Sequence, residues 1–219
     1  MSPARRRAAE VVTGSAADFV PPRPTLPRLR AAAAGCRGCA LWLHATQTVF
    51  GEGPAPAQVM FVGEQPGDQE DRVGRPFVGP SGRLLDEALE AAGIDRRRVY
   101  VTNAVKHFKF VRKEQTRRRL HKKPLLGEVR ACRPWLEEEI RLVRPGVIVA
   151  LGSTAAQSLL GSGFKVTERR GTVVTSEWGA IVATVHPSSV LRAPDDVRTE
   201  ARREFFRDIG AVARHLARH

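Results

Sequence analysis

Short apolar runs of strand length recur along the chain, and segments of helical periodicity separate them. Such short, mostly apolar runs are typical of strands that are buried on both faces of a sheet. The predicted strands cover residues 59–62, 99–102, 147–151, 172–175 and 180–185. Because strands alternate with helices, the pattern favours an α/β fold with three layers, αβα, around a central, mostly parallel sheet, in which we expect four strands.

Apolar residues at helical spacing predict the helices between these strands. The clearest helix runs from about Leu84 to Ala92, with Ser81 as the expected N-cap and Gly93 at its end. Further helices are predicted at residues 26–34, 135–142 and 155–160, and over the C-terminal residues, where apolar side chains share one face.

The first 25 residues differ from the rest in composition. They are rich in Ala, Arg and Pro, and the run from Val20 to Pro24 holds three prolines. Proline removes a backbone donor and keeps the preceding residue out of the helical region, so this run is not helical. We interpret residues 1–25 as a disordered leader and residues 26–219 as a single domain.

Polar loops follow three of the predicted strands directly. They cover residues 63–71, 103–124 and 186–192. The carboxyl ends of parallel strands meet at one edge of a sheet, and ligands of open α/β sheets bind there. We therefore expect these loops to converge on one site.

The charge balance limits the partners of the protein. The 219 residues include 36 Lys or Arg and 23 Asp or Glu, a net charge of +13, which attracts polyanions such as nucleic acids and also anionic membranes. No apolar run approaches the ~20 residues that span a bilayer. The basic start has no apolar segment of a secretory signal after it. We expect a cytoplasmic protein with no membrane association, and nothing in the pattern requires more than a monomer.

Much of the positive charge lies in the second polar loop and just after it. From Lys106 to Arg133 there are eleven Lys or Arg against two Glu, a local balance of +9. His121 lies at its centre, between the basic residues Arg117, Arg118, Arg119, Lys122 and Lys123. One interpretation is a solvated loop that keeps a basic protein soluble. The other is a loop that lies on a phosphate backbone and presents His121 to a group there.

The cysteines indicate a metal or redox site. Cys36 and Cys39 form a C-x-x-C pair, and Cys132 is the third cysteine of the chain. An odd number with such a pair fits a metal or redox site in a reducing compartment better than a disulfide framework.

Three motifs, each at a strand end, together resemble the uracil-DNA glycosylase superfamily. The first is G-E-Q-P-G-D-Q-E-D at 63–71, followed by G-R-P-F-V-G-P-S-G at 74–82. The others are V-T-N-A-V-K at 101–106 and H-P-S-S-V-L-R at 186–192. Within the superfamily the chain is most similar to the UdgX group, whose inserted K-R-R-I-H loop corresponds to R-R-R-L-H at 117–121 here. Members of that group form a very stable covalent link to uracil-containing DNA through the loop histidine.

The resemblance implies how a uracil would be held. Phe77 corresponds to the aromatic that stacks on the extruded base, and its alternative is an ordinary core Phe. Asn103 corresponds to the reader of the uracil edge, since an amide complements both N3–H and O4, and its alternative is a strand-end turn. His186 corresponds to the histidine that donates to uracil O2 as negative charge grows there, and its alternative is a structural His.

The same resemblance gives catalytic roles to Glu64, Gln65, His121 and His186. Many relatives carry an Asp at the position of Gln65, where it activates water, whereas a glutamine cannot take that proton. We assign Gln65 to uracil contact as well. With the water route weakened, His121 is the candidate that captures the sugar cation. Neighbouring cations favour its neutral, nucleophilic form. Glu64 then orients His121 or stabilises the sugar cation.

The resemblance also implies a DNA-contacting set and a cofactor. The DNA contacts are assigned to Arg117, Arg118, Arg119, Lys122, Lys123, Ser188, Ser189 and Arg192. Family 4 relatives hold a [4Fe–4S] cluster on four cysteines. Here Cys36, Cys39 and Cys132 match three of them, and His107 stands at the fourth position. Histidine replaces cysteine on iron in some clusters, but Zn²⁺ accepts the same donors and stays an alternative.

Three functions remain open on these residues. The first is a uracil-DNA glycosylase that excises uracil and is trapped covalently on the sugar C1′ through His121, with single-stranded DNA preferred because its bases are already unstacked. The second is a conventional family 4-like glycosylase with multiple turnovers. The third is a basic DNA-binding protein without catalysis.

Overall fold

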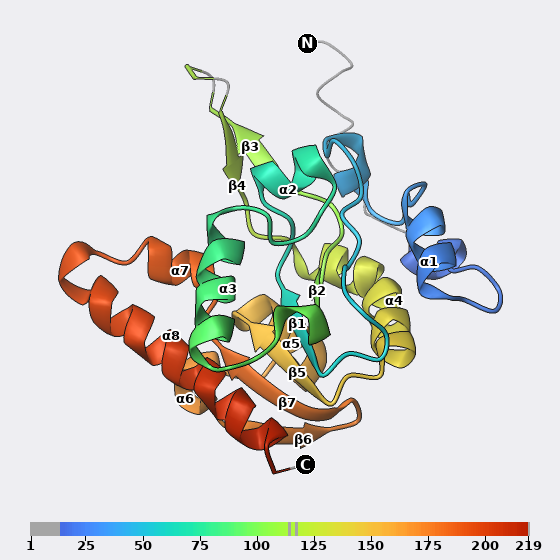
Figure 1. The fold of residues 1–219 in the computed structure, drawn as a ribbon. Coiled ribbons are helices and arrows are strands. Elements are labelled where there is room, and N and C mark those ends of the chain that lie inside the picture. Colours follow the sequence, from blue (N-terminus) through green and yellow to red (C-terminus); the bar gives the residue numbers. More distant parts are fainter. Residues whose placement is uncertain (1–13, 114, 117, 219) are drawn as a thin grey trace.

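The computed structural model describes residues 14–113, 115, 116 and 118–218. A central sheet of five strands has the order β2-β1-β5-β7-β6 (Figure 1). Its first four strands are parallel, and β6 pairs antiparallel with β7 at one edge. The strands are β1 (Val59–Gly63), β2 (Val99–Asn103), β5 (Val147–Leu151), β6 (Val173–Ser176) and β7 (Gly179–Thr184).

Helices cover both faces of the sheet. Side chains of α1 (Leu26–Ala33), α4 (Leu126–Val143) and α5 (Ser153–Leu160) form the core on one face, and Trp135 of α4 is its largest fully buried side chain. The other face packs against α3 (Pro80–Ala91), α7 (Pro187–Leu191) and α8 (Asp195–Leu216). The predicted three-layer αβα fold is thus confirmed (Figure 1).

The number of strands differs from the prediction by one. We expected four strands, and the fifth is the short edge strand β6, which a two-residue turn joins to β7. Its side chains alternate between exposed and half-buried positions, so it lacks the continuous apolar run that marks the parallel strands.

The N-terminal boundary also differs from the prediction. Residues 1–13 lie outside the described residues, but residues 14–25 are part of the fold and are not a disordered leader. A 3₁₀ helix, η3 (Ala16–Phe19), begins at Ser15, whose hydroxyl accepts a hydrogen bond from the Ala17 amide. Ala16 is fully buried in the same core as α4. The prolines exclude an α-helix, but they do not prevent packing.

Two short helices and a hairpin complete the edge of the sheet where the strands end. Helix α2 (Asp68–Val73) follows β1, and α6 (Val166–Arg169) follows α5. Helix α3 begins at Pro80 with Gly79 as its N-cap, not at Ser81 as expected, because the Glu70 carboxylate accepts from the Gly79 amide. Two further 3₁₀ helices are η4 (Ala40–Leu43) and η5 (Arg96–Arg98).

The basic loop is a β-hairpin. Strands β3 (Phe110–Arg112) and β4 (Arg119–His121) pair antiparallel, with Phe110 opposite His121. Figure 1 shows this hairpin above the carboxyl end of β1, beside α2. Among the described residues, no helix has the length and apolar character of a membrane span.

Candidate active site

A cavity of about 610 Å³ opens at the carboxyl edge of the sheet, where the three polar loops were predicted to converge. The register places Gly63 level with Asn103, and β5 and β7 end together at Leu151 and Thr184. Most predicted site residues line this cavity: Glu64, Gln65, Phe77, Asn103, Arg118, Arg119, His121, His186, Ser188, Ser189 and Arg192.

Gly63, at the end of β1, packs against two side chains that line the cavity, and we call these three residues the floor. A Cβ on this glycine would lie 2.3 Å from Oδ1 of Asn103 and 2.9 Å from Cζ of Phe77. Real Cβ atoms do not approach so closely, so the close packing of these two side chains depends on the missing Cβ. Asn103 is only 3% exposed and lies at the end of β2, as a reader of a buried base would.

Phe77 has a backbone conformation that bulky residues rarely adopt. Its φ is 56°, in the left-handed region. Helix α3 holds it there, because a Cβ on Gly82 would lie 1.7 Å from the Phe77 carbonyl oxygen. The Phe77 ring lies 6.5 Å from the His186 ring, with 26° between their planes. Such local strain is typical of functional sites.

His186 is neutral, and its tautomer follows from its contacts. The Ser188 amide donates to Nδ1 at 3.1 Å, and the Ser188 hydroxyl lies 2.8 Å from the same atom. Because Nδ1 accepts, the ring proton sits on Nε2. Burial lowers the His186 pKa to about 4, and the nearby His121 and Arg192 add to this. His186 therefore presents a neutral N–H donor.

His121 faces Glu64 across the cavity. Its Nε2 lies 3.4 Å from Oε1 of Glu64, while the Thr154 hydroxyl donates to Oε2 of the same carboxylate. Loss of solvent lowers the His121 pKa below its usual 6.5, and Arg192 lowers it further, whereas Glu64 raises it. The imidazole is thus mainly neutral near pH 7 and has a free electron pair for a nucleophilic role.

Gln65, predicted to contact uracil and to act in catalysis, lines the cavity, and its amide also bonds to the hairpin. Its Oε1 accepts from the Lys109 amide at 3.0 Å, and its Nε2 donates to the carbonyls of Lys109 and Lys122 at 3.1 and 3.2 Å. These bonds join the two ends of the hairpin, since Lys109 precedes β3 and Lys122 follows β4. All three hydrogen bonds of the Gln65 side chain go to backbone groups of the hairpin ends, so this side chain positions the hairpin.

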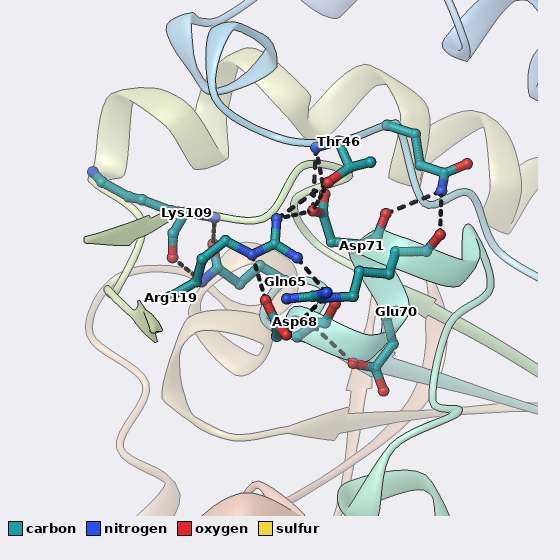
Figure 2. A network of polar contacts seen from close by, with 10 residues as sticks. Thr46, Gln65, Asp68, Glu70, Asp71, Lys109 and Arg119 are labelled. Carbon is teal, nitrogen blue, oxygen red and sulfur yellow. Dashed lines mark hydrogen bonds and ion pairs between the residues drawn. The ribbon is translucent and has the colours of Figure 1, made fainter. Parts of the chain in front are cut away.

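Arg119, predicted to contact DNA, is instead buried against α2, where its guanidinium pairs with acidic residues of the protein (Figure 2). Its side chain is 8% exposed and pairs with Asp68 through Nε and with Asp71 through Nη1, the latter at 2.6 Å. Asp71 also accepts from the amide and hydroxyl of Thr46. The guanidinium lies over the rings of Phe108 and Phe110. Arg119 therefore fixes the hairpin to the body of the protein.

A second ion pair fixes the root of the hairpin. Lys109 pairs with Glu128, near the start of α4, at 2.7 Å, and both side chains are nearly buried. The other basic residues assigned to DNA contact, Arg118, Lys122, Lys123 and Arg192, are exposed, and Arg117 lies outside the described residues. Ser188 is used by His186, and the Ser189 hydroxyl donates to the His186 carbonyl.

The predicted metal ligands are buried, but they do not form a metal site as they stand. Cys132 has a pKa raised to about 12 by burial, and Cys36 and Cys39 are near enough to raise it further. The His107 ring, in contrast, has its Nε2 at 2.9 Å from the Thr48 hydroxyl. Within the described part of the chain, no group of three or more Cys, His, Asp or Glu is arranged to hold a metal ion.

The sequence interpretation missed several residues of the site. Thr154 orients Glu64 through a hydrogen bond. The only feature of the sequence that could have indicated this role is the position of Thr154 just after a predicted strand. Asp68 and Asp71 receive Arg119, and their signal is the spacing of three residues that puts them on one face of α2. Lys106 and Glu139 form a fully buried pair beneath Asn103, for which the chain gave no local signal.

Comparisons with known proteins agree with this geometry. The family profile of the Uracil DNA glycosylase superfamily matches residues 50–210. The chain belongs to the uracil-DNA glycosylase superfamily. It is 39% identical over 176 residues to the Type-4 uracil-DNA glycosylase of Thermotoga maritima, covering 80% of this chain and 85% of the relative. The identity to the Type-4 uracil-DNA glycosylase of Archaeoglobus fulgidus is 38%, over 78% of this chain and 84% of the relative. The Type-5 uracil-DNA glycosylase of Pyrobaculum aerophilum is 29% identical over 87% of both chains.

The superfamily site should lose its base recognition when Gly63 gains a side chain. In Gly63→Ala the new Cβ displaces Asn103 and Phe77, and the loss of these contacts lowers uracil release by roughly tenfold or more. Single-turnover release from a uracil-containing oligonucleotide measures this. Gly127→Ala is the control, because a Cβ there meets no described heavy atom within 4 Å. Wild-type release by Gly63→Ala would contradict the close packing at the floor.

Removal of Arg119 should release the hairpin. Arg119→Met leaves the buried Asp71 without its cation, which costs about 3 kcal/mol of unfolding free energy. Hydrogen exchange should show faster exchange at the amides of Lys113 and Lys122, which bond across the hairpin. Arg118→Met, at an exposed position next to it, should keep the exchange rates and weaken DNA binding instead. Equal exchange in both variants would disprove the role of Arg119.

Proposed function

We propose that this protein excises uracil from DNA and that His121 captures the resulting sugar. The observation that carries this proposal is that the neutral imidazole of His121 faces the same cavity as Phe77, Asn103 and His186. The names of the three relatives described above support the first half, since each of these three is called a uracil-DNA glycosylase. Single-stranded DNA is the preferred substrate, because its bases need no unpairing before they enter the cavity.

The cavity residues divide the first step among them. Phe77 stacks on the base, and the Asn103 amide pairs with N3–H and O4 of uracil. The bond between C1′ and N1 breaks, and its electron pair leaves with uracil. The Nε2 proton of His186 stabilises the charge that grows on O2, and a neutral donor suits this role because it needs no carboxylate partner.

The second step is a capture of the sugar cation. A nitrogen of the His121 ring donates its electron pair to C1′, and the new imidazolium loses its remaining N–H proton to solvent or to Glu64. The Glu64 carboxylate, held by Thr154, stabilises the cationic sugar and the ring during this step. Gln65 cannot activate water, and the hairpin, fixed by Arg119, covers the site. Release of the adduct is therefore slow.

A conventional glycosylase with multiple turnovers is the second candidate. One observation favours it, because the Glu64 carboxylate lines the cavity and can take a proton from water in place of the missing Asp. In that case the basic hairpin only supports the DNA.

A denaturing gel separates these functions. Wild type and His121→Ala are mixed with a uracil-containing single-stranded oligonucleotide, with a thymine oligonucleotide as the substrate control and Lys122→Ala as the matched variant. A band that resists boiling should need both uracil and His121, and Lys122→Ala should still form it. Abasic product in excess of protein, with no such band, indicates ordinary turnover. If neither the band nor abasic product appears, the protein binds DNA without catalysis.

The capture should depend on pH through His121. Its pKa lies below the usual 6.5, so the neutral nucleophile persists to a more acidic pH than a free histidine would allow. We expect the capture rate to hold at neutral pH, to fall on acidification as protonation removes the electron pair, and to fall at a more acidic pH than for a free histidine. Quenched single-turnover assays measure this profile. A rate that rises on acidification would rule out His121 as the nucleophile.

We also propose that Cys36, Cys39, His107 and Cys132 hold a [4Fe–4S] cluster, with Zn²⁺ as the alternative. The burial and grouping of the three thiols support this, and His107 would have to turn from Thr48. Such a group is structural here, because it would connect the N-terminal segment to α4. The purified protein should be brown, with absorbance near 400 nm, and Cys132→Ser should lose the colour. A colourless protein that contains zinc would overturn the cluster.

A further inference from the structure

Lys106 is buried against the backbone of Asn103, a residue that lines the cavity, although none of the steps above uses it. Its side chain is 1% exposed. Lysine is rarely buried so fully unless it is paired. Its ammonium donates to Oε2 of Glu139 at 2.5 Å, to the Thr102 hydroxyl at 2.7 Å and to the carbonyl of Asn103 at 2.7 Å. These three bonds use all three N–H groups.

Glu139 holds the ammonium in place from α4. Its side chain is fully buried, and its Oε1 accepts from the Gly51 amide at 3.0 Å and the Tyr100 hydroxyl at 2.9 Å. Thr102 donates to the same carboxylate. Because each partner comes from a packed strand, helix or buried loop, the ammonium has one position only, and the bond to Asn103 is fixed with it.

The Asn103 carbonyl lies where β2 ends and the chain turns. After it, the amides of Ala104 and Val105 bond to the carbonyls of Gly63 and Glu64 at 2.9 and 3.0 Å. The Lys106 bond holds the carbonyl of Asn103 at the start of this turn. On the cavity side, the Asn103 amide has no spare room, since a Cβ on Gly63 would lie 2.3 Å from it.

We propose that Lys106 is a positioning residue for Asn103, and that it sets the selectivity of the site for the edge of uracil. The proposal rests on the proposed excision of uracil and on the role of Asn103 in it. A rotation of the Asn103 backbone would carry its amide away from N3–H and O4, and the charge-assisted bond to Lys106 opposes that rotation. A purely structural lysine would instead affect stability alone.

The test removes the charges of both partners together. In Lys106→Met/Glu139→Gln neither side chain is left as an unpaired buried charge, so the fold can be kept. A second double variant, Lys106→Leu/Glu139→Met, guards against a local packing defect. Tyr100→Phe is the matched control, because it removes a hydrogen bond from Glu139 but leaves Lys106 on Asn103. Circular dichroism and thermal unfolding check the fold of each variant.

Two rates and two affinities give the readout. Single-turnover release of uracil from an oligonucleotide is measured with and without free uracil as a competitor, and binding to an abasic oligonucleotide is measured separately. We expect a folded double variant to release uracil roughly tenfold to a hundredfold more slowly than wild type. The concentration of free uracil that inhibits it should rise by roughly the same factor. Its affinity for abasic DNA should equal that of wild type. Tyr100→Phe should match wild type in the rate of uracil release, in inhibition by free uracil and in affinity for abasic DNA.

The outcomes separate the proposal from the function beneath it. A wild type that releases no uracil refutes the proposed function. If wild type is active and a folded double variant keeps its release rate and its inhibition by uracil, Lys106 does not position Asn103. If Tyr100→Phe loses recognition to the same extent, or if neither double variant folds, the pair serves the fold in general and the proposal is rejected.

Discussion

The site depends on one buried guanidinium between two carboxylates. Arg119 joins the hairpin to α2 through Asp68 and Asp71, whereas Lys109 and Gln65 fix only the root of the hairpin. The hairpin strands themselves are three residues each, too short to be stable alone. His121, the proposed nucleophile, is therefore placed by ion pairs between residues far apart in the chain and not by the short strand that carries it.

Burial away from water has different effects on the ionisable side chains in different parts of this site. Around His121 and His186 it lowers the pKa of the rings and favours their neutral forms. Lys106 and Glu139 are buried as well, but each has the other as its partner and further hydrogen bonds around it. The consequence of burial thus differs with the partners that the fold supplies.

The layered fold and the meeting of the three loops could be predicted from the sequence, because continuous apolar runs and helical spacing are local signals. The residues at the strand ends, such as Asn103 and His186, followed from the same pattern. The contacts of Arg119 and Gln65 could not be predicted, because their partners are distant in the chain. Asp68 is 51 residues from Arg119, and Lys109 is 44 residues from Gln65. A run of basic residues gives no indication of which side chain is buried against the protein and which ones are exposed. Residues 172–175 were recognised as β-like, but the expected sheet counted only four strands, because a half-exposed strand has no continuous apolar run to show that it joins the sheet.

Helix α4 connects the two halves of the chemistry. Glu128 near its start binds Lys109 at the root of the hairpin, and Glu139, three turns later, binds Lys106 below Asn103. Eleven residues of α-helix span about 16 Å. The helix therefore sets the distance between the carboxylate that holds the root of the hairpin and the carboxylate that holds Lys106. One residue inserted between Glu128 and Glu139 would rotate one carboxylate by about 100° relative to the other, so the two sites can change their separation only in whole turns.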